Sequence, residues 1–92
     1  MTKIALLGAG GKMGVRLATN LRDTRFNVDH VEVSEAGRVR LKEAIGADCV
    51  DQASALADAD VILLAVPDRL IGQVAHEIIN DVESGAAVIV LD

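Results

Sequence analysis

A glycine-rich segment near the amino terminus constrains the fold of this chain more than any other feature of its sequence. An apolar run at residues 4–7 leads into Gly8-Ala9-Gly10-Gly11-Lys12-Met13-Gly14, and helical spacing of apolar residues follows. Glycines let a backbone turn tightly and approach a ligand closely, and the first amides of a helix attract anions. The segment therefore predicts a strand, a tight turn and a helix whose amino terminus can hold a diphosphate.

The glycines fit two related dinucleotide-binding patterns. Gly8 and Gly10 open a G-x-G pattern, while Gly8, Gly11 and Gly14 fit G-x-x-G-x-x-G. The strict G-x-G-x-x-G pattern is absent because Met13 occupies its last position. Taken alone, such a motif is also compatible with a strand-to-helix turn that binds no ligand.

An acidic residue downstream supports the dinucleotide interpretation. The next strand-like run covers residues 28–33 and contains Glu32, which follows Gly14 at about the spacing that the fingerprint requires. A carboxylate accepts hydrogen bonds from ribose hydroxyls but repels a 2'-phosphate, so Glu32 favours NAD over NADP. Arg38 and Arg40 keep NADP open, because guanidinium groups commonly bind a 2'-phosphate. The alternative role for Glu32 is a solvated charge at a strand end.

Size and composition restrict the class of protein. A chain of 92 residues forms one domain at most. Hydrophobic residues make up 51% and aromatic residues 1%, so the core consists of Val, Ile, Leu and Ala, as in a parallel sheet covered by helices. The net charge of −5 argues against a nucleic acid or an anionic membrane surface as partner. A lone Cys49 allows no internal disulfide, and no run is long enough for a membrane span, so we expect a cytoplasmic protein.

Short apolar runs alternate with helical spacing along the whole chain. Strands are expected at residues 3–7, 28–33, 61–66 and 87–91, with a weak one at 48–50. Helices are expected from Met13 to Leu21, between Ser34 and Gly46, over residues 52–57, and over 70–82 with Asp68 as N-cap. This alternation predicts an α/β fold, a Rossmann-type doubly wound parallel sheet with strand order 3-2-1-4-5 that ends after the fifth strand. A ligand cleft then lies between the first and fourth predicted strands.

The end of the fourth predicted strand is the second candidate site. The strand breaks at Ala65-Val66-Pro67-Asp68, beside the predicted cleft. The small side chains of Ala65 and Val66 leave room for the nicotinamide-side ribose against the backbone. Pro67 and Asp68 also fit an ordinary helix start that binds nothing.

The remaining polar residues offer little for catalysis. His30 lies inside the second predicted strand, and His76 lies off the apolar stripe of the last helix. Asp58 and Asp60 precede the fourth predicted strand, which is the wrong end of a parallel sheet for chemistry. We therefore expect no catalytic residue and no metal site in these 92 residues.

These segments together resemble the superfamily of 6-phosphogluconate, 3-hydroxyacid and prephenate dehydrogenases. Within it, the glycine-rich turn, Val-Glu-Val-Ser-Glu-Ala-Gly-Arg and Leu-Ala-Val-Pro-Asp are most similar to the D-apionate oxidoisomerases, which are NAD-dependent. The resemblance implies that residues 10–13 bind the diphosphate, that Glu32 binds the adenosine ribose, and that residues 65–68 lie beside the nicotinamide half. The cofactor-binding set expected from the motifs and the resemblance is Gly8, Gly10, Gly11, Lys12, Met13, Glu32, Ala65, Val66, Pro67 and Asp68.

The resemblance also implies a function for the full-length protein. It implies an oxidoreductase that transfers a hydride between NAD and a hydroxy acid, such as the sugar acid D-apionate. Residues 1–92 are then the dinucleotide-binding domain, and a further helical domain supplies the substrate pocket, the catalytic groups and a homodimer contact. Without that domain, we expect the apolar strand at residues 88–91 to be poorly covered at the sheet edge.

Two other functions stay open. The glycine-rich turn also resembles dihydrodipicolinate reductase, so an NADP-dependent reductase of that substrate or of imines is one alternative. That family tends to end the corresponding strand in an Asp-Phe-Thr-like sequence, however, where this chain has Ala65-Val66-Pro67. The other alternative is a non-catalytic Rossmann module that senses a nucleotide.

Overall fold

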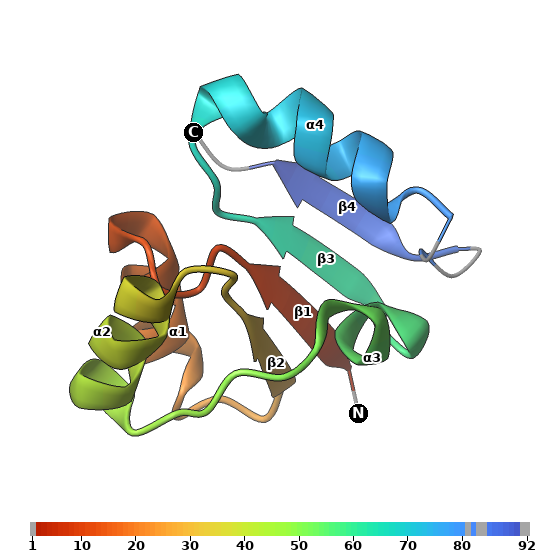
Figure 1. Ribbon diagram of the computed structural model, residues 1–92. Coiled ribbons are helices and arrows are strands. Elements are labelled where there is room, and N and C mark those ends of the chain that lie inside the picture. Colours follow the sequence, from red (N-terminus) through yellow and green to blue (C-terminus); the bar gives the residue numbers. More distant parts are fainter. Residues whose placement is uncertain (1, 81, 83–84, 91–92) are drawn as a thin grey trace.

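A parallel sheet lies between two layers of helices in the computed structural model, which describes residues 2–80, 82 and 85–90 (Figure 1). The elements in chain order are β1 (Lys3–Leu7), α1 (Lys12–Leu21), β2 (Asn27–Val31), α2 (Glu35–Ile45), α3 (Gln52–Ala57), β3 (Val61–Leu64), α4 (Asp68–Ile78) and β4 (Ala87–Val90). The alternation of strands and helices predicted from the sequence is confirmed.

The sheet has the order β2-β1-β3-β4, and every neighbouring pair is parallel. The chain runs from β1 to β2 on one side and later crosses to β3 on the other side, so β1 and β3 are neighbours. Their carboxyl ends meet at the edge to which all arrowheads in Figure 1 point. This is the place where the sequence predicted a cleft, because crossovers to both sides of one strand leave a crevice between their loops.

The weak third strand predicted at residues 48–50 is not formed. In the described part of the chain the sheet has four strands, and this segment contributes only an isolated parallel bridge between Cys49 and His30. The Val50 amide donates to the His30 carbonyl over 2.8 Å, so the segment still runs beside β2. Too few apolar residues lie between Asp48 and Asp51 to extend the pairing. The five-strand order 3-2-1-4-5 was therefore wrong in its strand count.

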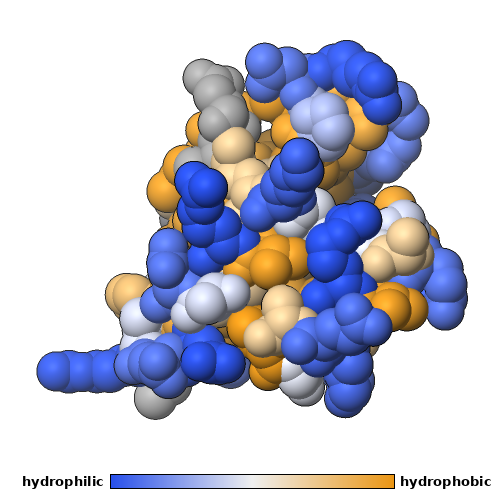
Figure 2. Space-filling model, turned by 90° about the vertical axis from the view of Figure 1, so that its left-hand side faces the viewer, coloured by the Kyte–Doolittle hydropathy of each residue, from blue (hydrophilic) through white to orange (hydrophobic). Residues whose placement is uncertain are grey.

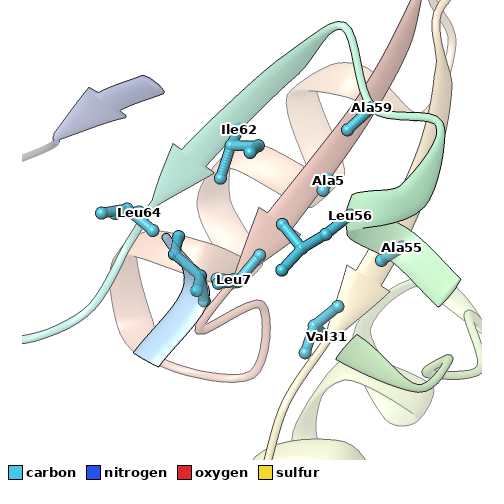
Figure 3. Packing of buried hydrophobic residues seen from close by; sticks show 9 residues of the cluster. Ala5, Leu7, Val31, Ala55, Leu56, Ala59, Ile62 and Leu64 are labelled. Carbon is cyan, nitrogen blue, oxygen red and sulfur yellow. The ribbon is translucent and has the colours of Figure 1, made fainter. Parts of the chain in front are cut away.

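The core consists of two apolar layers, one on each face of the sheet. On one face, Leu7 and Ile62 pack with Leu56 of α3 and Ile78 of α4. Figure 3 shows side chains of this layer pointing toward one another from β1, β3 and α3. On the other face, Leu6 packs with Ala18 of α1 and Leu41 of α2. Strand β1 is buried on both faces from its second residue onward, which explains the unbroken apolar run at residues 4–7.

The predicted ends of the second helix are confirmed. Ser34 is the N-cap of α2, with its side chain accepting from the Gly37 amide, and Gly46 ends the helix at φ 70°. The outer sides of α1 and α2 face solvent. Figure 2, which looks at this side of the molecule, shows hydrophilic side chains around a smaller hydrophobic area.

The last helix differs from its predicted limits. Pro67, and not Asp68, is the N-cap of α4, because the Pro67 carbonyl already accepts from the Leu70 amide over 2.8 Å. The helix ends at Ile78, before Val82, although the Val82 side chain still packs against the core. The apolar stripe thus continues past the last helical turn.

Strand β4 leaves apolar side chains at the sheet surface. Val88, Ile89 and Val90 are 46%, 45% and 46% exposed, as expected for a strand whose faces lack a full cover. Leu91, which the sequence placed in this strand, and Asp92 lie outside the described residues. Among the residues described, no helix is both long and apolar enough to cross a bilayer.

Candidate dinucleotide-binding site

The turn after β1 is held tightly against the end of β3. Gly8 adopts φ 79°, a left-handed conformation that residues with a β-carbon rarely adopt. A β-carbon at Gly8 would lie 2.9 Å from the carbonyl carbon of Ala65. The Ala65 amide in turn donates to the Leu7 carbonyl over 2.9 Å. Glycine at this position therefore allows the two loops of the crevice to touch.

Hydrogen bonds also fix the same turn to β2. The amides of Gly8 and Ala9 both donate to the Val31 carbonyl, over 2.9 and 3.1 Å. The Gly11 amide donates to the Gly8 carbonyl over 3.1 Å. These three amides therefore already have acceptors, so an anion would be bound by the amides of the residues that follow.

The amino terminus of α1 is open for an anion. Its N-cap is Gly11, which has no side chain to cap the helix, whereas Ser34 caps α2 and Asp51 caps α3. Among the hydrogen bonds of the described residues, the amides of Lys12, Met13 and Gly14 find no acceptor. No acidic residue occupies the first turn. Free amides and the positive end of the helix dipole together form a site for a negatively charged group.

Gly14 brings α1 close to the turn. A β-carbon there would meet the Gly8 carbonyl oxygen and would lie 2.7 Å from the Ala9 α-carbon. The turn, and not the body of the strand, is therefore the neighbour that requires glycine at this position. The first turn of the helix consequently lies directly behind the glycine-rich loop.

Glu32 lies just after β2 and connects two backbone segments. One carboxylate oxygen accepts from the Gly10 amide over 2.9 Å, and the other accepts from the Ser34 amide over 3.0 Å. Glu32 is half-buried and lines the cavity between these loops. Each oxygen keeps a further lone pair, so the carboxylate can still accept from a ligand hydroxyl.

The two arginines of α2 donate to backbone carbonyls. Arg38 donates from Nε to the Glu32 carbonyl over 2.9 Å and from Nη2 to the Val33 carbonyl over 3.2 Å. Arg40 donates from Nη1 to the Gly10 carbonyl. Both guanidinium groups therefore have structural partners, and Arg40 also lines the cavity at the turn.

The loop after β3 forms the opposite wall. Ala65 is buried, Val66 is half-buried, and Pro67 and Asp68 are exposed where α4 begins. Like α1, α4 has no side-chain cap. Two uncapped helix ends thus face the crevice from its two sides.

Two adjoining cavities occupy the crevice. A cavity of about 440 Å³ lies between the turn after β1, the end of β2 and helix α4, with Gly8, Gly11 and Glu32 in its wall. A second cavity of about 300 Å³ lies between the first turns of α1 and α4, with Lys12 and Met13 on one side and Asp68 on the other. Ala65, Val66 and Pro67 line both. An extended ligand could therefore run from one cavity to the other past these three residues.

All ten residues expected at the cofactor lie at this edge of the sheet. Gly10 differs from the others, because it lines neither cavity and its amide is already bonded to Glu32. Sequence reasoning did not assign a site role to Ser34, Gln52, Leu70, Gln73, Val74 and Glu77, which also line the larger cavity. Leu70 and Val74 belong to the apolar stripe of α4, and only the three-dimensional structure shows that the first part of this stripe faces the cavity.

The other titratable candidates lie away from the crevice. His30 lines a hollow between α1 and the segment after α2, where burial lowers its pKa while the nearby Asp29 carboxylate acts in the opposite direction. His76 is exposed on α4. Burial, followed by the Glu32 carboxylate, raises the pKa of the Cys49 thiol. These groups offer no acid or base at the crevice.

The aspartates before β3 serve the structure at the opposite edge. The Lys3 ammonium lies 3.1 Å from the Asp29 carboxylate and 3.5 Å from that of Asp58. The Lys3 amide donates to the Asp60 carboxylate over 2.9 Å. These contacts confirm that Asp58 and Asp60 lie at the amino ends of the strands.

A parallel sheet with a glycine-rich turn, an uncapped first helix and an acid after the second strand defines a Rossmann-type α/β domain. The chain belongs to the family described as acetohydroxy acid isomeroreductase, NADPH-binding domain, whose family model matches residues 1–91.

Similar proteins bear out the resemblance to D-apionate oxidoisomerases. The chain is 53% identical over 90 residues to a D-apionate oxidoisomerase of Cupriavidus necator and 54% identical over 92 residues to one of Rhizobium rhizogenes. The alignments cover 98% and 100% of this chain but 33% and 34% of the relatives, so the chain spans about a third of their length.

A solved structure shares the fold closely. It is described as a semialdehyde dehydrogenase NAD-binding protein from Cupriavidus necator in complex with calcium and NAD. Its TM-score to this chain is 0.96 at 52% sequence identity, and the match covers 100% of this chain and 33% of that one.

Proposed function

We propose that this chain is the NAD-binding domain of an oxidoreductase that transfers a hydride between NAD and a hydroxy sugar acid of the D-apionate kind. The names of the similar proteins and the NAD complex of the similar structure support this function. In the proposal, residues 1–92 form the dinucleotide-binding domain, and a further domain supplies the catalytic groups and the substrate pocket.

The uncapped amino terminus of α1 is the observation that carries the proposal. Free amides at Lys12 and Met13 face a crevice that is also lined by Gly11 and Ala65, whose small size lets a diphosphate approach the backbone. The Gly10 amide is bonded to Glu32. We therefore assign the diphosphate to residues 12 and 13, with Gly8 and Gly11 providing space.

The remaining contacts follow from the shape of the crevice. The adenosine ribose would lie in the larger cavity, where its hydroxyls reach Glu32. The nicotinamide half would lie in the smaller cavity, against Ala65, Val66, Pro67 and Asp68. Bound there, the dinucleotide would accept or supply the hydride, while the chain binds it and orients its nicotinamide toward the substrate.

NADP is a second candidate cofactor, because the description of the matching family names NADPH. Two observations favour NAD. Glu32 places a carboxylate in the wall of the larger cavity, where it would repel a 2'-phosphate, and the guanidinium groups of Arg38 and Arg40 are bonded to backbone carbonyls. A 2'-phosphate would have to compete for those donors.

For the intact protein we propose a small hydroxy acid as substrate, a homodimer and a cytoplasmic location. The acidic sequence, with a net charge of −5 and one cysteine, fits that location. The exposed side chains of Val88–Val90 fit burial against another part of the assembled protein.

Calorimetric titration of the intact protein with NAD and with NADP tests the cofactor. We expect the protein to bind NAD. If NADP also binds, we expect its affinity to be lower than that of NAD. Tighter binding of NADP would refute the role of Glu32, and an intact protein that binds neither dinucleotide would refute the proposed function. Formation of NADH on addition of D-apionate then tests the substrate class.

A further inference from the structure

We propose that Arg40 is a positioning residue that, together with Glu32, fixes the glycine-rich turn in the conformation that binds the diphosphate. This inference rests on the proposed function and adds a residue that acts on the cofactor through the backbone. It assigns Arg40 a role different from the 2'-phosphate contact that its position in the sequence suggested.

Two hydrogen bonds from charged side chains hold Gly10. Its amide donates to the Glu32 carboxylate over 2.9 Å, and its carbonyl accepts from the Arg40 guanidinium. The amide and the carbonyl of one residue belong to consecutive peptide planes. Both planes beside the Gly10 α-carbon are therefore held by charged side chains, whereas a glycine without such contacts rotates more freely than any other residue.

Helix α2 approaches the glycine-rich turn closely. A β-carbon at Gly10 would meet the backbone of Gly37, and a β-carbon at Gly37 would lie 2.6 Å from the Glu32 side chain. Arg40 follows Gly37 by one helical turn, so it projects from the same side of α2. The helix that touches Gly10 thus also carries the guanidinium that binds its carbonyl.

Gly10 directly precedes the anion site in the chain. The carbonyl that Arg40 binds belongs to the peptide that contains the Gly11 amide, and Gly11 is the N-cap of α1. The free amides of Lys12 and Met13 come directly after it. Fixing this peptide presets the direction of those amides, so less ordering is needed when a diphosphate binds.

The test compares Arg40→Met with Arg25→Met in the intact protein. Both substitutions remove one positive charge, but Arg25 is exposed in the loop before β2, at the opposite edge of the sheet. We expect Arg40→Met to weaken the binding of NAD and of ADP-ribose about tenfold by calorimetry, since a charged hydrogen bond is lost. Arg25→Met should bind both as the wild type does, and Arg40→Lys should recover part of the loss.

Three results would overturn the proposal. Unchanged NAD and ADP-ribose affinity in Arg40→Met would show that the turn needs no such support. A loss confined to NADP would make Arg40 a direct phosphate ligand. A loss in Arg40→Met that Arg40→Lys does not relieve, with a matching fall in the thermal stability of the ligand-free protein, would reduce Arg40 to a general structural role. Failure of the wild type to bind NAD or NADP would instead refute the proposed function.

Discussion

Gly8 and Ala65 join the carboxyl ends of the two central strands so closely that a β-carbon on Gly8 would lie 2.9 Å from the Ala65 carbonyl carbon. The same glycine has φ 79°. We predict that Gly8→Ala lowers the free energy of unfolding by about 2–3 kcal/mol, because the left-handed backbone and the backbone contact both oppose a methyl group. Urea denaturation measures this change.

A second glycine provides the matched control for Gly8→Ala. Gly72 lies inside α4, and nothing lies within 4 Å of the β-carbon it would gain. Gly72→Ala should raise the free energy of unfolding by about 0.5–1 kcal/mol, since alanine favours a helix interior. Equal effects of the two substitutions would contradict the geometry described for Gly8.

Glu32→Gln should weaken NAD binding about tenfold while leaving the fold intact. The amide nitrogen of glutamine would face either the Gly10 or the Ser34 amide, both of which are donors, so one hydrogen bond is lost and one backbone amide is left without its acceptor. The affinity for NADP should fall less, because the repulsion between the carboxylate and a 2'-phosphate disappears. Calorimetry with both dinucleotides measures the ratio.

Glu35→Gln is the control for that experiment. Glu35 is the first residue of α2, and its side chain, 86% exposed, lies 3.8 Å from the Arg38 guanidinium. It should leave the affinity for both dinucleotides unchanged. A similar loss in the two variants would mean that negative charge near α2, and not the contacts of Glu32, governs binding.

The N-cap of α2 gives a third prediction. The Ser34 hydroxyl accepts from the Gly37 amide over 2.9 Å, so Ser34→Ala should lower the free energy of unfolding by about 1 kcal/mol. Ser34→Asn, which keeps an acceptor at the cap, should remain close to the wild type. Thermal unfolding of the three proteins distinguishes a lost cap from a general intolerance of substitution at this position.

His30 should make stability depend on pH. Burial lowers its pKa below the ordinary value of 6.5, so the folded protein favours the neutral ring. The neutral His30 ring contributes to stability in full above the pKa that histidine has in the unfolded chain. This contribution is lost as the pH falls from that pKa toward the lower pKa of His30 in the folded protein. Between pH 7.5 and 5.5, taken as about one unit on either side of 6.5, the melting temperature should fall more in the wild type than in His30→Gln.

The exposed His76 supplies the comparison. His76→Gln should retain the wild-type fall in melting temperature, because that side chain lies in solvent on α4. If His30→Gln and the wild type lost stability in parallel across this range, burial of His30 would not be the cause.

Much of this architecture could be predicted because local signals and burial agree. The apolar residues of β1 are continuous because both faces of that strand are covered. Helix α2 begins after Ser34, whose side chain accepts a hydrogen bond from a backbone amide, and ends at Gly46, which adopts a left-handed conformation. The prediction of a weak strand at residues 48–50 was wrong because this segment has few apolar side chains to bury. The segment lies between Asp48 and Asp51 and forms only one isolated bridge, from Cys49 to His30.

The contacts within the site were harder to predict. The sequence located Gly10 and Glu32 in separate motifs, but nothing in their spacing indicates that one carboxylate oxygen binds the Gly10 amide. The bond from Arg40 to the Gly10 carbonyl joins residues 30 positions apart and depends on how closely α2 approaches the turn. Such contacts follow from tertiary packing, which no local pattern encodes.

The backbone contact between Gly10 and Gly37 makes these two positions a single unit for protein engineering. A β-carbon at Gly10 would meet the Gly37 backbone, and a β-carbon at Gly37 would meet the Glu32 and Ser34 side chains. A larger residue at Gly10 therefore cannot be offset by changing Gly37, which is already the smallest residue. A library that varies cofactor preference should therefore keep both glycines constant and place its diversity at solvent-facing neighbours such as Val33, which is 82% exposed.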